Sequence, residues 1–102
     1  MEALVVGMSE LVDPEWAEAR SIAEVERFVQ AGRVVVVTPL ELAGPVAEGD
    51  EEAAEVAAAS VCAWLGARVF RTRRPDRLRQ AVQMTQTIAG RRPPTLTRRG
   101  LA

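Results

Sequence analysis

The side chains in this chain that are best suited to chemistry are three closely spaced arginines. Arg71 lies near the end of a short β-branched and aromatic segment, 67–72, and Arg73 and Arg74 follow it. A cation at the carboxyl end of a parallel strand commonly holds an anionic ligand, and free backbone N–H groups at a following helix start bind phosphate or sulfate. This spacing predicts an anion-binding site. The structural alternative is that Arg71 pairs with a carboxylate such as Glu41, while its two neighbours are solvated.

The composition excludes most other chemistry. The 102 residues contain no Lys, His, Asn or Tyr, and all 13 basic residues are Arg. The single Cys62 cannot form an intramolecular disulfide and has no histidine base, so a small core residue explains it better than a nucleophile. Glu51, Glu52 and Glu55 lie at a predicted helix start, where the helix dipole favours acidic side chains. We expect no catalytic residue, no metal and no cofactor.

Charge is distributed unevenly, although the net charge is −1. Residues 1–60 carry 13 acidic residues and three Arg, whereas residues 61–102 carry one acidic residue and ten Arg. The two halves could attract each other within one chain or between two, but solvated faces of ordinary helices explain the pattern more simply. No aromatic residues are interspersed among the C-terminal arginines, so we predict a solubilising tail there and no nucleic-acid binding.

The sequence has no membrane signal. No apolar run reaches the length of a membrane span, and no basic-then-apolar leader precedes a cleavage site. We therefore expect a cytoplasmic protein without membrane association. The hydrophobic content is 48%, mostly Ala and Val, and such small side chains suit close packing of helices on a sheet.

Strands and helices alternate along the chain and must position the arginines. Apolar runs predict strands at 3–8, 34–38 and 67–72, and the four consecutive Val of the second are typical of a strand buried on both faces. Capping signals and apolar periodicity predict helices near 14–19, 22–31, 51–65 and 75–89, with a loop at 40–50. The β-α-β-α-β-α order predicts a three-stranded parallel sheet in one α/β domain, 1–90, followed by an extended or disordered basic tail, 91–102.

Three motifs in a row carry a family resemblance. The Ala-rich helix around 57–59 is followed by the run Leu-Gly-Ala-Arg-Val-Phe-Arg-Thr-Arg-Arg at 65–74 and by Arg-Gln-Ala at 79–81. This order resembles the C-terminal end of dihydropteroate synthase, the pterin-binding (β/α)8 enzyme of folate synthesis, which has Arg-Gly-Ala, two hydrophobic residues and Arg-Val-His-Asp between such helices. Residues 34–44 resemble the family's strand followed by Ser-Arg-Lys-Ser-Phe. The resemblance over about 1–89 implies the last three units of that barrel.

The resemblance implies an anion contact but not the family's catalysis. The Lys of Ser-Arg-Lys contacts the pterin in the family, whereas Leu40 stands at that position and Thr38 matches the Ser. Arg71 matches the Arg that, together with the His, holds the anionic phosphate end of the substrate. Arg73 and Arg74 replace the His and the Asp. The resemblance therefore implies a phosphate, sulfate or pterin-like ligand near these four polar residues, and no synthase activity from this chain alone.

A piece of a barrel predicts association with another chain. Helices would cover only the outer face of the sheet, so alternate Val of the second strand would stay exposed on the inner face, and exposed apolar sheet is normally covered by a partner. The resemblance adds that the synthases dimerise through helices from this end of the barrel. We expect a homodimer or a synthase-like partner chain, with interface candidates Trp16, Trp64, Val35 and Val37, although either Trp could equally be a core residue.

Two alternatives to a non-catalytic, associating protein stay open. One is a ligand-binding protein or enzyme whose phosphate or pterin site is completed only on assembly. The other is a self-contained three-stranded sheet with helices on both faces, which would need no partner.

Overall fold

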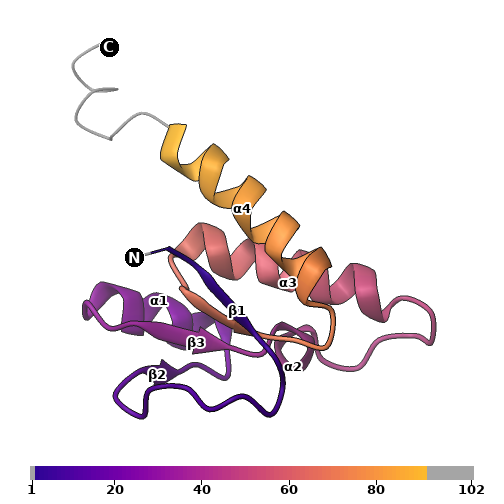
Figure 1. Ribbon diagram of the computed structural model, residues 1–102, viewed down its shortest axis with the longest axis horizontal. Helices are drawn as coiled ribbons and strands as arrows, with labels where there is room; N and C mark the ends of the chain where they lie inside the picture. Colours follow the sequence, from indigo (N-terminus) through magenta and orange to yellow (C-terminus); the bar gives the residue numbers. More distant parts are fainter. Residues whose placement is uncertain (1, 92–102) are drawn as a thin grey trace.

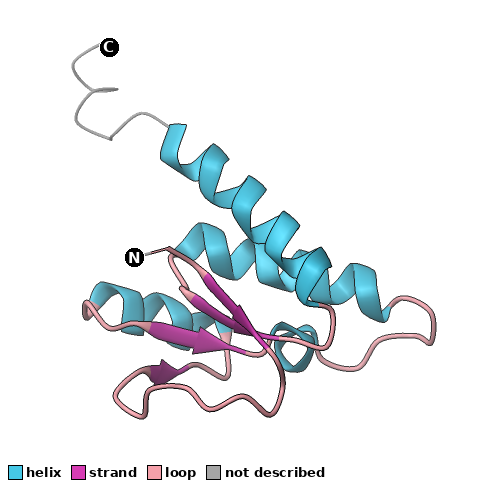
Figure 2. Ribbon diagram, viewed as in Figure 1, coloured by secondary structure: helices cyan, strands magenta, loops and turns pink. Residues whose placement is uncertain are grey.

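Four short parallel strands form one sheet in this computed structural model, which describes residues 2–91 (Figure 1). The strands are β1 (Leu4–Val6), β2 (Ala17–Glu18), β3 (Val35–Val37) and β4 (Val69–Arg71), in the spatial order β1-β4-β3-β2. The predicted α/β class and parallel sheet are confirmed, as Figure 2 shows. The prediction of three strands was wrong, because β2 adds a fourth strand at one edge.

The order of the strands differs from that of consecutive barrel units. β3 pairs with β2 and β4, its neighbours in sequence, and β4 also pairs with β1, the first strand. In a run of (β/α)8 barrel units each strand lies beside the next one in the sequence, so the strand predicted at 34–38 would lie between the other two predicted strands. Here β4 lies between β1 and β3, so the sheet does not have the strand order expected for the last three units of a barrel, and β1 and β2 are its two edges.

The helices lie together against one face of the sheet (Figure 1). They are α1 (Ile22–Gln30), α2 (Pro39–Ala43), α3 (Glu51–Leu65) and α4 (Pro75–Arg91). The helices predicted at 22–31, 51–65 and from 75 are confirmed. The predicted loop at 40–50 instead begins within the short helix α2, and α4 continues through Gly90, which we had expected to end it.

Local chemistry fixes where α1 and α3 begin and end. The Ser21 hydroxyl caps α1 by accepting a hydrogen bond from the backbone N–H of Glu24 at 3.1 Å. α3 ends at Gly66, whose φ of 113° is favourable only for glycine. A Cβ at Gly66 would also lie 3.0 Å from a methyl carbon of Val29, so this glycine lets α3 end against α1.

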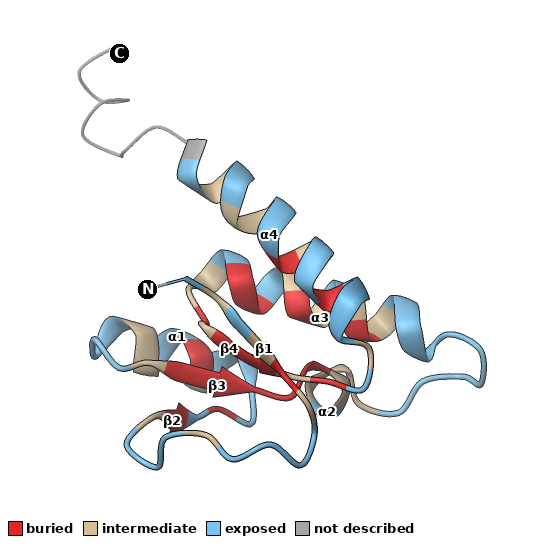
Figure 3. Ribbon diagram, viewed as in Figure 1, coloured by how far each residue is buried: buried red, intermediate tan, exposed pale blue. Residues whose placement is uncertain are grey.

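The main core lies between the sheet and the helices. From the sheet, Val35, Val37 and Phe70 point toward the helices and are fully buried. The facing helical residues are Val25 of α1, Ala59, Cys62 and Ala63 of α3, and Leu78 and Val82 of α4. Figure 3 shows this burial ending partway along α4, whose second half extends away from the sheet. Phe70 is the fully buried aromatic side chain of this core, and the partly buried Phe28 packs against it.

A second, smaller core covers the opposite face of the sheet. The connection from β1 to β2 must return from the carboxyl end of one strand to the amino end of another parallel strand, so it crosses this face. Val12 and Trp16 of the connection pack on Val6, Val36 and Val69, and Val36 is only 1% exposed. The expectation that the inner face would stay exposed was wrong, because this chain covers it with its own loop.

The helix predicted near 14–19 is absent from the described structure. Residues 14–16 form a turn, and β2 follows at once. The Asp13 carboxylate accepts a hydrogen bond from the backbone N–H of Glu15 at 2.8 Å, as an N-cap residue would, but the chain then extends. The predicted tail at 91–102 lies outside the described residues except for Arg91, which belongs to α4. Within residues 2–91, each helix falls short of the length and apolar character needed to cross a membrane.

Candidate functional site

The predicted anion site lies at the carboxyl edge of β3 and β4. Arg71 is the last residue of β4, and Thr38 directly follows β3, the neighbouring strand. Arg73 and Arg74 lie in the short connection from β4 to α4. The structure therefore brings all four predicted residues to one edge of the sheet. Thr38 is buried, and its carbonyl accepts the backbone N–H of Glu41 at 2.9 Å at the start of α2.

The charge of Arg71 is already neutralised within the chain. Its guanidinium Nη1 donates a hydrogen bond to Oε1 of Glu18, which lies in β2 on the far side of β3. The Arg71 side chain is 18% exposed and that of Glu18 is 39% exposed, so the pair lies at the surface of the sheet edge. We had considered Glu41 as the partner of Arg71, but the ion pair is with Glu18. An anionic ligand that binds Arg71 would have to displace the Glu18 carboxylate, which belongs to the same chain.

Arg74 is part of a buried network between α3 and the start of α4. Glu55 of α3 is 1% exposed; its Oε1 accepts a hydrogen bond from Arg74 Nη1 at 2.8 Å, and its Oε2 accepts one from the Thr72 hydroxyl at 2.7 Å. The Thr72 oxygen in turn accepts the backbone N–H of Arg74 at 2.8 Å. Both carboxylate oxygens are therefore satisfied, as a buried charge requires. These contacts give Arg74 a structural role.

Arg73 is the remaining cation of the predicted cluster. Its neighbour Arg74 has a second contact to Glu52, at 3.7 Å, and Glu52 also pairs with Arg77 at 3.4 Å. Among residues 2–91, Arg73 is exposed and has no ion pair. The cluster thus provides one uncompensated guanidinium, which is less than the three that the sequence suggested. Over the same residues, no group of three His, Cys, Asp or Glu side chains is arranged to hold a metal ion.

Cys62 lies away from the predicted anion site, inside the protein. Its side chain is fully buried in the main core, between α3 and the sheet. Burial raises the pKa of the Cys62 thiol to about 11 because the thiolate would lose its hydration. The thiol therefore stays protonated at neutral pH, and the interpretation as a core residue is consistent with its place.

The outer side of α3 is the most unusual surface of the molecule. From residue 56 to residue 67 the sequence has no charged side chain, and Glu55 is buried against the sheet. The side of α3 that points away from the sheet carries Ala53, Ala57, Val61 and Trp64, all exposed; we call these four residues the α3 face. Val61 is 48% exposed and Trp64 is 40% exposed. A helix that is apolar on all sides is normally covered on all sides.

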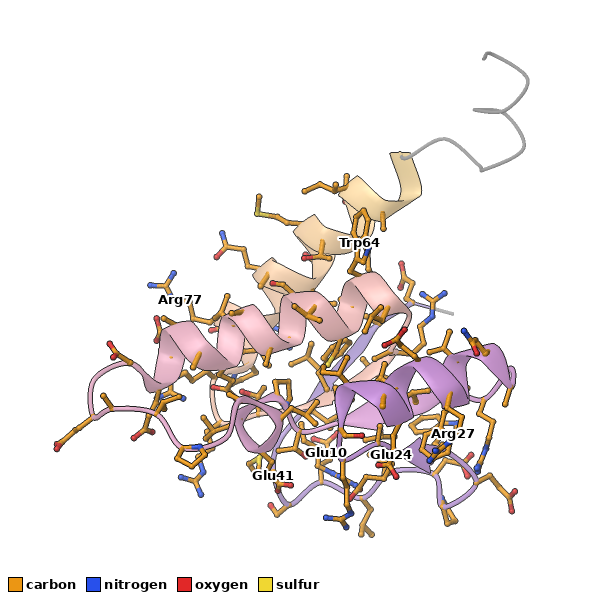
Figure 4. All side chains as sticks on the ribbon, turned by 180° about the vertical axis from the view of Figure 1, so that it is seen from behind. Glu10, Glu24, Arg27, Glu41, Trp64 and Arg77 are labelled. Carbon is orange, nitrogen blue, oxygen red and sulfur yellow. The ribbon has the colours of Figure 1, made fainter. Side chains whose placement is uncertain are left out.

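Two open grooves lie on either side of the α3 face. The groove toward α1 and α2 holds about 380 Å³, and apolar side chains line it: Ile22, Leu42, Ala43, Ala54, Ala57, Ala58 and Val61. The groove toward α4 is lined by Ala53, Val56, Ala81 and Met84, with polar side chains of Glu52, Arg77 and Gln80. Figure 4 shows Trp64 projecting from the end of α3 alongside α4, and Arg77 near the opposite end. The apolar surface therefore extends from α3 onto α1, α2 and α4.

The four predicted interface residues occupy three different places. Val35 and Val37 are fully buried beneath the helices, so neither has surface to offer a partner. Trp16 is half-buried over the second core, where it covers the sheet. Trp64 alone lies on the exposed apolar surface. Sequence reasoning missed Glu18 and the α3 face, although the uncharged stretch at 56–67 was visible in the sequence.

The comparisons with known proteins do not assign a family. No protein-family model matches the chain, and neither the curated proteins nor the solved structures contain a match. The resemblance to the end of dihydropteroate synthase therefore stays a prediction, and function has to be inferred from the geometry of this chain.

Proposed function

We propose that this protein is a non-catalytic, dihydropteroate-synthase-like module that acts by binding another protein chain through the α3 face. The observation that carries the proposal is the exposure of Val61 and Trp64 on a helix with no charged side chain from residue 56 onward. A contiguous exposed apolar surface on a small domain marks an interaction site. An exposed Trp on such a surface is typical of the residues that contribute most to binding.

The reason for association is different from the one the sequence suggested. Both faces of the sheet are buried by this chain, so a partner is not needed to cover β3. The surface that lacks a cover is the outer side of the helical layer. Stable interfaces bury about 800 Å² of solvent-accessible surface on each partner, which is the scale of a helix face together with its neighbouring grooves.

The polar residues support binding of a chain better than catalysis. Arg71 and Arg74 are each held by a carboxylate of this chain, and the thiol of Cys62 is buried. The sequence contains no His or Lys to act as a general base. The parallel sheet with helices between its strands is a feature shared with (β/α)8 proteins, although β1 lies beside β4 here, and a binding module would retain such units without the family's reaction.

An anion-binding function is the alternative proposal. Arg73 is exposed without an ion pair among the described residues, and the Thr38 hydroxyl makes no capping hydrogen bond to α2 at the same sheet edge. Assembly with another chain could complete a phosphate or pterin site there. Isothermal titration of the assembled protein with pyrophosphate and with a pterin pyrophosphate tests it, and an absence of heat at millimolar ligand would exclude it.

The main proposal is tested by sedimentation velocity of the full chain. The chain is measured alone and mixed with a purified dihydropteroate synthase, each at concentrations up to about 200 μM, a range that detects micromolar affinities. We expect association in at least one of the two samples, and we expect Val61→Arg to abolish it because a charge would be buried at the centre of the interface.

The matched control is Leu11→Arg. Leu11 is 96% exposed and lies on the loop over the opposite side of the sheet, so the substitution adds the same charge outside the α3 face. It should leave the association unchanged. Sedimentation as a monomer in both samples, or equal effects of the two substitutions, would contradict the proposal.

A further inference from the structure

We infer that the partner of the α3 face is a second copy of this chain, with the two α3 helices packed antiparallel across a two-fold axis. The inference rests on the proposed function and names its partner and geometry. The observation that carries it is that the two ends of α3 bear opposite charges without ion pairs, and the middle of the helix bears none.

The acidic end is the start of α3. Glu48, Asp50 and Glu51 lie in the last residues of the preceding loop and the first residue of the helix, and all three are exposed. Within residues 2–91 none of the three forms an ion pair. Their neighbour Glu52 is different, because it pairs with Arg74 and Arg77 of its own chain. This end therefore carries acidic groups available to a partner.

The basic end follows the last turn of α3. Arg68 comes directly after Gly66 and Ala67, and it lines the same surface groove as Trp64, at the edge of the α3 face. Across the described residues Arg68 also forms no ion pair, although Arg71, Arg74 and Arg77 all do. The half-buried cation next to Trp64 thus lacks a carboxylate among the described residues of this chain.

These charges select the direction of packing. If two α3 helices met in parallel, acidic groups would face acidic groups and Arg68 would face Arg68. An antiparallel pair places Glu51 of each copy near Arg68 of the other, and a two-fold axis makes this contact twice. The 15 residues of α3 separate the two ends by about 21 Å, which exceeds the Debye length of about 8 Å, so the contacts act independently.

The shape of the helical layer suits the same arrangement. The groove between α3 and α2 is apolar throughout and is bordered by Ala54, Ala57 and Ala58, whose small side chains let another helix approach closely. Under a two-fold axis, α3 of each copy lies in this groove of the other, as ridges pack into grooves. The interface centre then contains no charge, so association requires no desolvation of an ion. A chain with a different charge pattern would gain only the apolar part of this contact.

Charge reversal in the full chain tests the inference. The variants are Glu51→Arg, Arg68→Glu and the double variant, with sedimentation equilibrium at physiological ionic strength as the readout and circular dichroism to confirm folding. Each single variant should raise the dimer dissociation constant by roughly tenfold, because two attractive contacts become repulsive. The double variant should return it to within roughly threefold of the original, since both contacts are restored with reversed sign. Glu15→Arg, on the loop over the opposite sheet face, is the control and should have no effect.

The outcomes separate this inference from the proposed function. A chain that does not self-associate, but binds the synthase in a manner blocked by Val61→Arg, would refute the two-fold pairing and leave the α3 face as the binding site. If Val61→Arg blocks self-association, but the double charge-reversal variant associates no better than the two single variants, the antiparallel geometry alone would be refuted. Weaker dimerisation of both single variants, together with recovery of the dimer affinity in the double variant, is the result that supports the antiparallel pairing.

Discussion

Arg71 of β4 and Glu18 of β2 form an ion pair across β3, the strand that separates them. The pair therefore ties together two strands that do not share a hydrogen-bond ladder. It also places a carboxylate of this chain where the resemblance to dihydropteroate synthase implies the phosphate end of a substrate. One contact thus contributes to the structure of the sheet edge and occupies the cation that was the best candidate for a ligand.

Removing this carboxylate should expose Arg71 to anions. Glu18→Gln is expected to lower the free energy of unfolding by about 0.5–1 kcal/mol, since both side chains are partly exposed and such pairs are weak. The same variant should bind phosphate more tightly than the original protein does. Urea unfolding and NMR titration with phosphate measure the two effects. Glu15→Gln, which removes an exposed carboxylate without an ion pair, is the control, and equal phosphate affinity in all three proteins would contradict the prediction.

The buried network around Glu55 should depend on the Thr72 hydroxyl. Thr72→Val keeps the shape but leaves Glu55 Oε2 and the backbone N–H of Arg74 without partners, at an expected cost of about 1–3 kcal/mol. Thr72→Ser should retain most of the stability because it keeps the hydroxyl. Thr87→Val is the matched control, since that exposed hydroxyl bonds only a helix carbonyl. Urea unfolding ranks the variants, and a loss in Thr72→Val no larger than in Thr87→Val would show that the network is unimportant.

The two tryptophans should have different roles. Trp16→Ala is expected to lower the free energy of unfolding by about 2–3 kcal/mol, because Trp16 packs on Val6, Val36 and Val69. Trp64→Ala should cost less in stability but weaken association more, since Trp64 belongs to the α3 face. Unfolding is measured at low protein concentration and association by sedimentation velocity. The opposite ranking in the two measurements would place the binding surface elsewhere.

Cys62 should make stability depend on pH in the alkaline range. Its pKa is raised from 9.0 to about 11 by burial, so the folded state favours the protonated thiol. The stabilisation is complete below pH 9, where the unfolded thiol is also protonated, and it is lost as the pH rises from 9 toward 11. Two pKa units correspond to at most about 2–3 kcal/mol.

The composition of the chain simplifies the interpretation of this pH dependence. With no Lys or Tyr in the chain and with Arg always protonated, Cys62 is the only side chain that titrates in this range. Urea unfolding of the original protein between pH 8 and 11 should show the decline, and Cys62→Ala should show a flat profile whatever its absolute stability. A decline of the same size in both proteins would assign the effect to another cause.

The sequence was informative where local signals decide the structure. Acidic residues at 50–52 and Gly66 bound α3, and a run of Val marks β3. The signal at Asp13 was misleading, because the carboxylate makes the same backbone hydrogen bond at a turn as at a helix start. Ala17 and Glu18 have no preference for strands, and β2 forms because neighbouring β3 supplies the carbonyls of Val34 and Val36. Pairing of this kind is tertiary and has no local signature.

The candidate site could be predicted only as a set of residues. The sequence placed Thr38, Arg71 and Arg73 at strand ends, and parallel strands brought them to one edge. Which carboxylate would meet Arg71 was not predictable, since Glu18 is 53 residues away and the chain offers many others. The covering of the second sheet face depends likewise on how one loop crosses it.

The neighbour order of the strands also sets an order of events during synthesis. β1 is the earliest of the four strands to be made, but its pairing partner β4 follows about 65 residues later. At roughly 5–20 residues per second, β1 waits several seconds for β4, while β2, α1 and β3 can already pair as consecutive units. Because β1 and the apolar loop after it cannot be buried until β4 is in place, the nascent chain is most vulnerable to misassembly during that interval.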